Sequence, residues 1–251
     1  MILRDISFPT PEENILFDDV LLYLAERGDS PEVLRFWESG QPFIVLGRVC
    51  KEKDDVNIEA AIRDGIPLLR RSSGGGTVVQ GRGCLNYSLI LDKKKDPHLA
   101  DLRQSYRVIL SKVIDMLQLL GVDAVFQPIS DLAIKNNQKK FSGNAQKRGR
   151  QFILHHGTLL YDFDLALIEK YLKIPRDIPE YRRGRTHLEF VANIPLSIKE
   201  IKKGFRKLFP VSQEENSLNQ LERNCLKNLL ESRNVIIDLA NESSHEMRTN
   251  L

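Results

Sequence analysis

The chain has 251 residues, of which 41% are hydrophobic and 28% are charged, a composition typical of a globular protein with one sizeable core. Its formal net charge is only +3, which excludes a strongly basic nucleic-acid-binding protein. No apolar run is long enough to span a membrane, and residues 1–9 lack the apolar core and cleavage site of a signal peptide. We therefore expect neither nucleic acid nor a membrane as a partner.

The three cysteines, Cys50, Cys84 and Cys225, lie far apart in the sequence. None forms a CxxC pair or stands at zinc-ligand spacing from a histidine, which excludes a disulfide scaffold and a zinc finger. Unpaired cysteines are typical of proteins in a reducing compartment, so we expect a cytoplasmic protein. The absence of an internal sequence repeat excludes a solenoid.

Capping signals and hydrophobic periodicity define the elements of the first part of the chain. A helix is predicted to begin after Thr10 and to end at Gly28, because Thr10 and Glu13 are spaced as a capping box and glycine is a typical stop. Strands are predicted over Val33–Trp37, Phe43–Leu46, 66–71 and 85–91, with a helix over 57–64, a loop over 72–76 and extended chain over 77–80. The strand over 85–91 alternates large apolar residues with asparagine and serine, which predicts one apolar and one polar face.

The second part of the chain continues to mix helices and strands. Apolar residues recur at helical spacing over 104–120, strands are predicted over 122–126, Asp131–Ile134 and 151–161, and helices over 165–172 and 197–208. Residues 211–251 are predicted to form a polar, weakly helical tail with a frayed end over 241–251. Because the elements do not alternate as regular βαβ units, we expect an α+β (mixed α/β) fold around one main sheet over residues 1–210.

The densest chemical signal is a glycine-rich segment after two arginines, Arg70-Arg71-Ser72-Ser73-Gly74-Gly75-Gly76-Thr77. Consecutive glycines permit close approach of the backbone. Their N–H groups can form a concave anion site, beside which arginines supply forked donors. The segment matches neither GxxxxGK[ST] nor a complete GxGxxG. A flexible surface turn remains the alternative interpretation.

Two further motifs follow. Asp131 precedes Lys139-Lys140-Phe141-Ser142-Gly143, in which a lysine could hold a carboxylate and a phosphate together; a solvated lysine pair in a turn is the alternative. His155-His156-Gly157-Thr158 lies in a predicted strand, where neighbouring residues face opposite sides. We therefore expect one histidine to face a pocket and the other to face packing or solvent, which argues against a metal site.

The order and spacing of these motifs resemble the lipoate–protein ligase A family, which belongs with biotin protein ligases and octanoyltransferases. The resemblance runs from about Thr10 to Leu172 and implies a mixed, mostly antiparallel sheet sandwiched by helices, with a curved pocket for a lipoyl chain. It further implies that residues 1–210 are the catalytic domain, and that residues 211–251 are not a full accessory C-terminal domain. A separate accessory subunit is therefore left open as a partner.

For the activity, the resemblance implies ATP-dependent conversion of lipoate to lipoyl-AMP, with ATP and Mg²⁺ required. The lipoyl group would then pass to a lysine ε-amine of a lipoyl-carrier domain. Such carriers are the E2 proteins of 2-oxoacid dehydrogenases and proteins like the H protein of glycine cleavage.

The resemblance also assigns residues to these roles. Lys140 is the expected catalytic residue, which contacts the acyl carboxylate and the α-phosphate, whereas Lys139 would point elsewhere. The residues expected to bind the nucleotide and acyl-adenylate are Arg71, Gly75, Gly76, Thr77, Val78, Val79 and Lys140. Those expected in the lipoate pocket are Arg70, Ser73, Asn86, Gly143, His156, Gly157 and Thr158. Asp131 matches an acidic position with a magnesium or ribose role.

Two other functions fit the sequence. An octanoyl- or lipoyltransferase that moves a preactivated acyl group needs a nucleophilic cysteine. Residues 125–131, where related transferases carry one, contain none; Cys84 could reach the pocket, while Cys50 and Cys225 are expected to be inert. A non-catalytic binding module is suggested by the basic clusters at 147–150 and 182–185, which could be solvated loops or could steer an acidic carrier domain.

Overall fold

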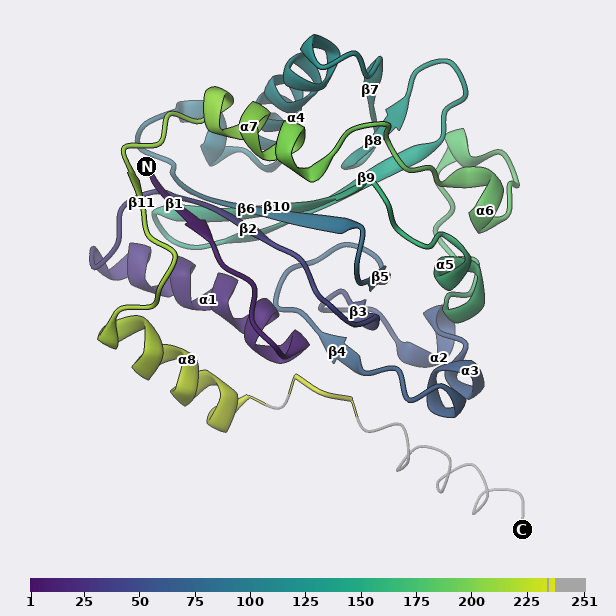
Figure 1. Ribbon diagram of the computed structural model, residues 1–251, viewed down its shortest axis with the longest axis horizontal. Coiled ribbons are helices and arrows are strands. Elements are labelled where there is room, and N and C mark those ends of the chain that lie inside the picture. Colours follow the sequence, from purple (N-terminus) through teal and green to yellow (C-terminus); the bar gives the residue numbers. More distant parts are fainter. Residues whose placement is uncertain (234, 238–251) are drawn as a thin grey trace.

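The computed structural model describes residues 1–233 and 235–237, so the predicted frayed end over 241–251 lies outside the described residues. An eight-stranded sheet runs through the molecule in the order β11-β1-β2-β6-β10-β9-β8-β7 (Figure 1). Its strands are β1 (Ile2–Asp5), β2 (Val33–Trp37), β6 (Cys84–Asp92), β7 (Ala124–Gln127), β8 (Asp131–Ile134), β9 (Lys140–Arg148), β10 (Phe152–Leu160) and β11 (Gln213–Glu214). Strand β1 pairs in parallel with β2 and β11, and the other neighbours are antiparallel. The predicted mixed, mostly antiparallel sheet is confirmed.

A second, three-stranded sheet has the order β4 (Leu68–Arg70), β3 (Phe43–Leu46), β5 (Val78–Gln80). Strand β3 is central, parallel to β4 and antiparallel to β5. The glycine-rich segment joins β4 to β5, so it crosses from one edge of this small sheet to the other. The sheet thereby fixes both ends of the segment.

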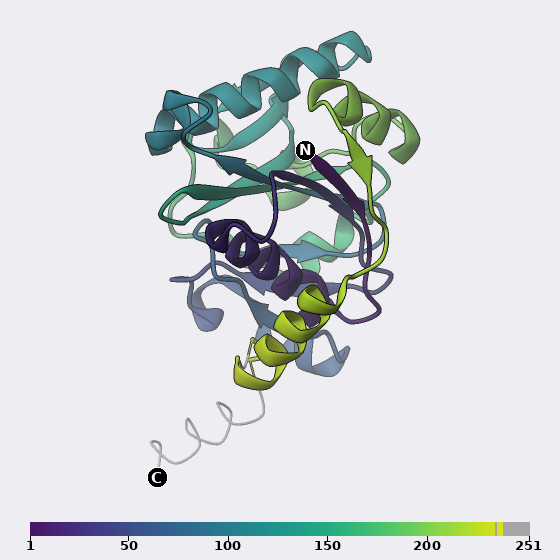
Figure 2. The same ribbon diagram turned by 90° about the vertical axis from the view of Figure 1, so that its left-hand side faces the viewer.

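Helices cover both faces of the large sheet, as predicted. The helices α4 (Leu102–Leu119) and α7 (Ile198–Leu208) pack on one face, and α1 (Pro11–Arg27) lies on the other with α8 (Gln220–Ser232) against it (Figures 1 and 2). Short elements complete the structure: α2 (Glu52–Asp55), α3 (Ile58–Arg63), the 3-10 helix η1 (Pro97–Ala100), α5 (Ala166–Tyr171), the 3-10 helix η2 (Glu180–Arg182) and α6 (His187–Phe190). None of the helices in the described part of the chain combines the length and apolarity needed to cross a membrane.

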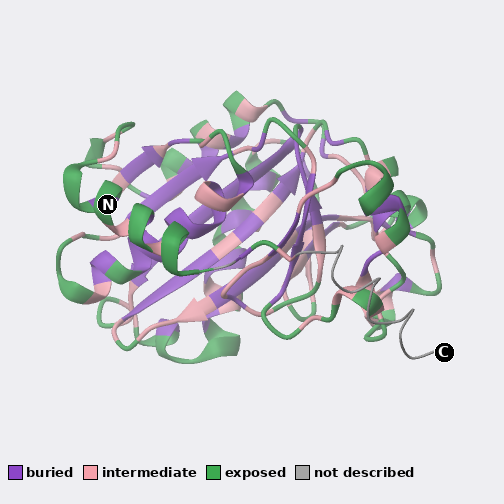
Figure 3. Cartoon of the chain, turned by 90° about the horizontal axis from the view of Figure 1, so that it is seen from below, coloured by how far each residue is buried: buried purple, intermediate pink, exposed green. Residues whose placement is uncertain are grey.

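The first long helix forms where its sequence signals predict. The Thr10 side chain accepts a hydrogen bond from the Glu13 amide, and the Glu13 carboxylate accepts in return from the Thr10 amide. Gly28 ends the helix in the left-handed conformation, with φ of +82°. The predicted alternation over 85–91 is confirmed, with Leu85, Tyr87, Leu89 and Leu91 together in one core cluster. The polar face with Asn86 and Ser88 is buried as well, because α1 covers that face of β6. Figure 3 shows the strands of the large sheet as mostly buried.

Among the elements that were not predicted, three depend on distant partners. Strand β1 is short and pairs with β2 and β11. Strand β9 begins at Lys140, in a stretch that looks like a polar turn, but its polar residues Ser142, Asn144 and Gln146 are buried against neighbouring elements. Helix α8 lies in the predicted weakly helical tail and buries Leu226 beside α1.

Candidate functional site

A large cleft of about 1400 Å³ opens between the two sheets. Its walls are the glycine-rich segment, the start of β9, the turn before β8 and the chain between α5 and α6. A narrower pocket of about 140 Å³ adjoins it and reaches α1 and β2. The residues that line both cavities include Thr77, Val78, Asp131, Lys140 and Thr158. The two cavities therefore meet at Lys140.

The glycine-rich segment lies directly on the turn that follows β3. Gly75 adopts a left-handed φ of +84°, and the Arg48 amide donates to the Ser73 carbonyl at 2.9 Å. A Cβ atom on Gly47 would lie 1.9 Å from the carbonyl oxygen of Gly75, so only glycine fits at position 47. Sequence reasoning missed Gly47, whose only local signal is a glycine after an apolar strand.

The Arg71 guanidinium fixes the shape of the glycine-rich segment through hydrogen bonds to it. Its Nε donates to the Ser73 hydroxyl at 3.1 Å, and one terminal nitrogen donates to the carbonyls of Gly74 and Gly76, each at 2.7 Å. Burial lowers the pKa of Arg71 to about 10. Arg71 therefore acts on the loop carbonyls, and it also lines the narrow pocket.

Arg70, the neighbouring arginine, points elsewhere. Its guanidinium donates to the carbonyls of Gly47 and Cys50 and pairs with Glu52 at 3.0 Å. Arg70 lines neither cavity, whereas the other predicted site residues each line at least one. Arg70 is therefore not part of the candidate acyl pocket. Its role is to hold the segment that follows β3.

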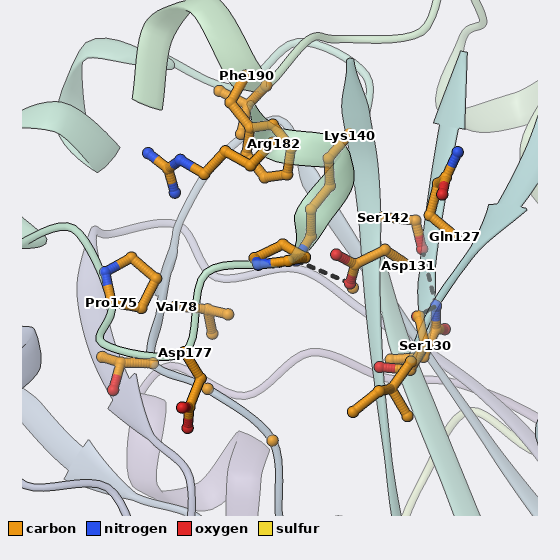
Figure 4. A pocket seen from close by; sticks show the side chains of 18 of the residues that line it. Val78, Gln127, Ser130, Asp131, Lys140, Ser142, Pro175, Asp177, Arg182 and Phe190 are labelled. Carbon is orange, nitrogen blue, oxygen red and sulfur yellow. Dashed lines mark hydrogen bonds and ion pairs between the residues drawn. The ribbon is translucent and has the colours of Figure 1, made fainter. Parts of the chain in front are cut away.

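Lys140 and Asp131 form an ion pair at the junction of the two cavities. The Lys140 Nζ lies 2.8 Å from Asp131 Oδ1, and the Tyr181 hydroxyl donates to Asp131 Oδ2 at 2.7 Å. Gly143 makes room for the lysine, since a Cβ there would lie 3.2 Å from Nζ. Burial and the Asp131 charge raise the pKa of Tyr181. Figure 4 shows Lys140 and Asp131 across the cleft from Val78, Pro175 and Asp177.

The two histidines of β10 face opposite sides, as strand alternation predicts. His156 lines the narrow pocket, and its Nε2 lies 2.7 Å from the Ser73 hydroxyl; burial lowers its pKa to about 4. His155 is buried on the other face beside Gln146 and Tyr87, and burial lowers its pKa to about 3. Both rings are therefore neutral near pH 7.

Asn144 links β9 to the turn that carries Asp131. Its side chain accepts from the Tyr87 hydroxyl at 2.5 Å and donates to the Ser130 carbonyl at 2.8 Å. A Cβ on Gly157 would lie 1.9 Å from Asn144 Oδ1, so glycine at 157 admits this amide. Neither Asn144 nor Tyr87 was among the predicted site residues, although Asn144 belongs to the lysine motif.

The inner end of the narrow pocket combines apolar walls with an acidic residue. Its apolar lining residues are Ile15, Trp37, Val45 and Leu154. Asp18 also lines it, paired with the fully buried Arg35 at 2.6 Å and accepting from Ser88 at 2.7 Å. The sequence prediction treated this face of α1 as apolar. The signal that could have revealed the site is the acidic pair Asp18-Asp19 within the otherwise apolar stretch 15–22.

Neither Cys84 nor Cys50 lies in an environment that favours a thiolate. Cys84 is buried and donates to Gln80 at 3.3 Å, and burial raises the pKa of its thiol. Burial also raises the pKa of Cys50, which lies 3.4 Å from the Gly75 carbonyl oxygen. A nucleophilic cysteine needs a lowered pKa, so neither environment favours a thioester mechanism.

Several side chains of the basic clusters make structural contacts, so these clusters are not simply the solvated loops that the sequence left as one alternative. Lys147 pairs with Asp19 at 2.6 Å, and Arg148 donates to the carbonyls of η1. Arg182 is only 3% exposed and stacks on the Phe190 ring at 4.8 Å. These side chains hold parts of the protein together, which weakens their role in steering a carrier.

The described residues contain no group of three or more histidine, cysteine, aspartate or glutamate side chains that could hold a metal ion. Asp131 is a single carboxylate, already paired with Lys140. The site therefore lacks an all-protein metal cage, in contrast to dedicated metal centres.

Comparison with known proteins gives a consistent picture. The model of the lipoyl protein ligase A/B catalytic domain matches residues 10–209. A probable lipoate-protein ligase A from Mycoplasma pneumoniae is 34% identical over 166 residues, which cover 66% of this chain and 47% of that protein. The matched part spans about half of the length of the first curated relatives. The octanoyltransferase LipM of Geobacillus kaustophilus is 25% identical over 256 residues, covering 90% of this chain and 92% of that one.

Two solved structures share the fold. A bipartite lipoate protein ligase from Thermoplasma acidophilum, described with its E2 lipoyl domain, has a TM-score of 0.76 at 23% identity over 92% of both chains. A lipoate-protein ligase A bound with ATP has a TM-score of 0.76 at 22% identity, over 92% of this chain and 94% of that one. At these identities the similarity establishes the mixed α+β fold of the lipoate ligases.

Proposed function

The chain belongs to the family of lipoyl protein ligase A/B catalytic domains, and from this premise we propose that it is a lipoate–protein ligase. The proposed reaction joins lipoate to ATP as lipoyl-AMP and then transfers the lipoyl group to a carrier lysine. The observation that carries the proposal is the position of Lys140, at the junction of a wide cleft and a narrow pocket. A nucleotide needs the first shape, and a long acyl chain with one carboxylate needs the second.

The chemistry requires a cation at this junction. In the first step a lipoate carboxylate oxygen forms a bond to the α-phosphorus of ATP, and the bond to pyrophosphate breaks. In the second step a carrier lysine amine forms the amide, AMP leaves, and the amine loses a proton. Negative charge builds on the α-phosphate and then on the acyl oxygen. The compact ammonium of Lys140, oriented by Asp131, suits both positions.

The other proposed roles follow from where the side chains lie. Gly75, Gly76, Thr77, Val78 and Val79 would contact the adenylate, with Arg71 holding their segment in shape. The acyl chain would pass residues of the narrow pocket, namely Ser73, Asn86, Gly143, His156, Gly157 and Thr158.

For ATP, the ATP-bound ligase of the same fold supports the proposal. Mg²⁺ usually binds through one or two carboxylates together with substrate phosphates. The single carboxylate of Asp131 fits an ion that arrives with the nucleotide, where it would neutralise phosphate charge.

As partners we propose lipoyl-carrier domains of the E2 or H-protein type and a separate accessory chain, supported by the bipartite ligase with the same fold. We further propose that residues 1–210 form the catalytic unit, followed by the tail over 211–251. The cysteines are unpaired, which supports a reducing cytoplasm as the compartment.

A transferase that moves a preactivated acyl group is the second candidate, favoured by the nearly full-length similarity to an octanoyltransferase. The buried Cys84 with its raised thiol pKa argues against it. Transfer from lipoyl-AMP, without an activation step of its own, needs no cysteine and remains compatible with the site.

The deciding experiment follows the mass of a lipoyl-carrier domain incubated with the protein and lipoate, with and without ATP and Mg²⁺. We expect a lipoyl mass increment that requires ATP and is lost in Lys140→Ala. Lys139→Ala is the matched control and should retain the increment, because Lys139 lines neither cavity.

Two other outcomes separate the alternatives. Modification only from supplied lipoyl-AMP would mean a transfer subunit whose activating part lies elsewhere. Inertness with both donors, but modification from an octanoyl thioester of acyl carrier protein, would overturn the ligase proposal.

A further inference from the structure

The buried carboxylate of Asp19, on α1, joins three segments that are distant in the sequence. It is 6% exposed. Its Oδ1 accepts from the Ser72 hydroxyl and from Lys147 Nζ, each at 2.6 Å, and its Oδ2 pairs with Arg233 at 2.7 Å. Ser72 begins the glycine-rich segment, Lys147 lies on the strand that starts at Lys140, and Arg233 ends α8.

The chain after Arg233 reaches the same segment by a second route. Val235 accepts a hydrogen bond from the Arg70 amide at 2.8 Å, and the Ile237 amide donates to the Leu68 carbonyl at 2.8 Å. These bonds place residues 235–237 beside β4, which leads into the glycine-rich segment. The same three residues therefore extend the edge of the small sheet.

The first half of α8 is also held firmly. Glu222 pairs with the buried Arg4 at 2.5 Å, and Leu226 is buried beside α1. The helix thus offers Arg233 from a fixed position. A loop whose ends are already ordered loses less conformational entropy when it closes on a ligand.

We propose that Asp19 and Arg233 are positioning residues for the glycine-rich segment, through which the C-terminal helix strengthens binding of the acyl-adenylate without touching it. The inference rests on the proposed function for the identity of the ligand. Arg233 contacts Asp19, and Asp19 in turn contacts Ser72. Removing the side chain of Arg233 or of Ser72 therefore interrupts the same series of contacts.

Three variants test this chain: Ser72→Ala, Arg233→Gln and the two combined. The probe is a non-hydrolysable lipoyl-sulfamoyl adenosine, whose Kd is measured by calorimetry. We expect each single variant to raise Kd about tenfold, which corresponds to about 1.4 kcal/mol. The double variant should be no weaker than either single one, because groups in one chain of contacts are not additive. In Arg233→Gln the rate of transfer from saturating lipoyl-AMP should stay within about twofold, since Arg233 lines neither cavity and Lys140 is untouched.

The matched control is Asp5→Asn, which removes the ion pair with Lys202 at 2.7 Å on β1, outside both cavities. It should leave Kd unchanged. Hydrogen exchange of the amides of residues 72–77 supplies a readout that needs no ligand: Arg233→Gln should accelerate it, and Asp5→Asn should not.

The outcomes separate the two proposals. Additive losses in the double variant, or unchanged Kd and unchanged exchange in Arg233→Gln, would overturn the positioning role. If the wild-type protein failed to bind the probe while Arg233→Gln still accelerated exchange, the positioning role would stand and the proposed ligand would be wrong.

Discussion

Two cations line the narrow pocket, Arg71 and Lys140, and they are held in opposite ways. Arg71 is half-buried, and its donors point to carbonyls of its own loop. Lys140 is 28% exposed at its side chain and faces a carboxylate at the junction of the cavities. Arg71 therefore shapes the site, whereas Lys140 remains available to a ligand. Charge alone does not identify a catalytic residue; the partners of that charge do.

The largest expected effect on the reaction rate comes from Lys140. Lys140→Ala should lower the rate of lipoyl-AMP formation about 100- to 1000-fold, the usual cost of removing one donor to developing charge. The melting temperature should change little, because Asp131 keeps Tyr181 as a donor. Pyrophosphate release and thermal unfolding measure the two effects. A loss of stability as large as the loss of rate would make Lys140 a structural residue like Arg71.

Acid should lower the stability of the fold through His156, which lines the narrow pocket together with Arg71. Unfolded His156 binds a proton below about pH 6.5, whereas the folded ring stays neutral down to about pH 4. The folded state is therefore fully favoured above pH 6.5 and loses up to about 3 kcal/mol as pH falls to 4. Urea unfolding between pH 7 and 4.5 should show a shallower loss in His156→Gln than in wild type. Equal slopes would contradict a folded His156 ring that stays neutral at this pH.

Arg71→Lys should affect stability and binding together. An ammonium cannot reproduce a guanidinium that donates to the Ser73 hydroxyl and to two carbonyls through separate nitrogens, so the free energy of unfolding should fall by about 1.5–3 kcal/mol. The KM for ATP should rise while Lys140 still supports the chemistry. Chemical denaturation and initial rates measure this. Full activity with wild-type stability would show that the loop keeps its shape without the guanidinium.

A smaller effect is expected from Gly47→Ala, in the turn on which the glycine-rich segment lies. The added methyl meets the Gly75 carbonyl, and overpacking of this kind costs about 1–3 kcal/mol. Gly40→Ala is the control, since nothing lies within 4 Å of its Cβ position. The melting temperature and the KM for ATP should change only in Gly47→Ala. Equal behaviour of the two variants would mean that the loop shifts freely.

The smallest expected effect distinguishes the ligase from a cysteine transferase. Cys84→Ala should keep the rate of carrier modification within about twofold, because the buried thiol stays protonated. Carrier mass spectrometry checks this with every donor tested. A loss of more than about 100-fold, with an intact fold, would reinstate a thioester mechanism.

The sequence predicted what local pattern controls. The capped helix α1 and the apolar strands β2 and β3 were predicted because their signals lie within a few residues, whereas the mixed, mostly antiparallel sheet was implied by the family resemblance. It also located the glycine-rich segment and the lysine motif. Arg70 and Arg71 show the limit: both are arginines before the same glycines, and only their places around β4 send one toward Glu52 and the other into the loop.

What escaped prediction depends on pairs far apart in the chain. Gly47 is required because Gly75 lies against it, and Asp19 matters because Ser72 and Arg233 reach it. Strand β9 was missed because its polar side chains are buried by neighbours that no local window contains. These are properties of the packed molecule rather than of any segment.

The buried Arg4 has a consequence for synthesis on the ribosome. Its guanidinium pairs with Glu215 and Glu222, which follow it by 211 and 218 residues. Until those residues emerge from the exit tunnel, the first strand carries an uncompensated charge that resists burial. The edge of the sheet should therefore close late, and a nascent chain stalled before residue 215 should leave β1 open to proteases or to chaperones.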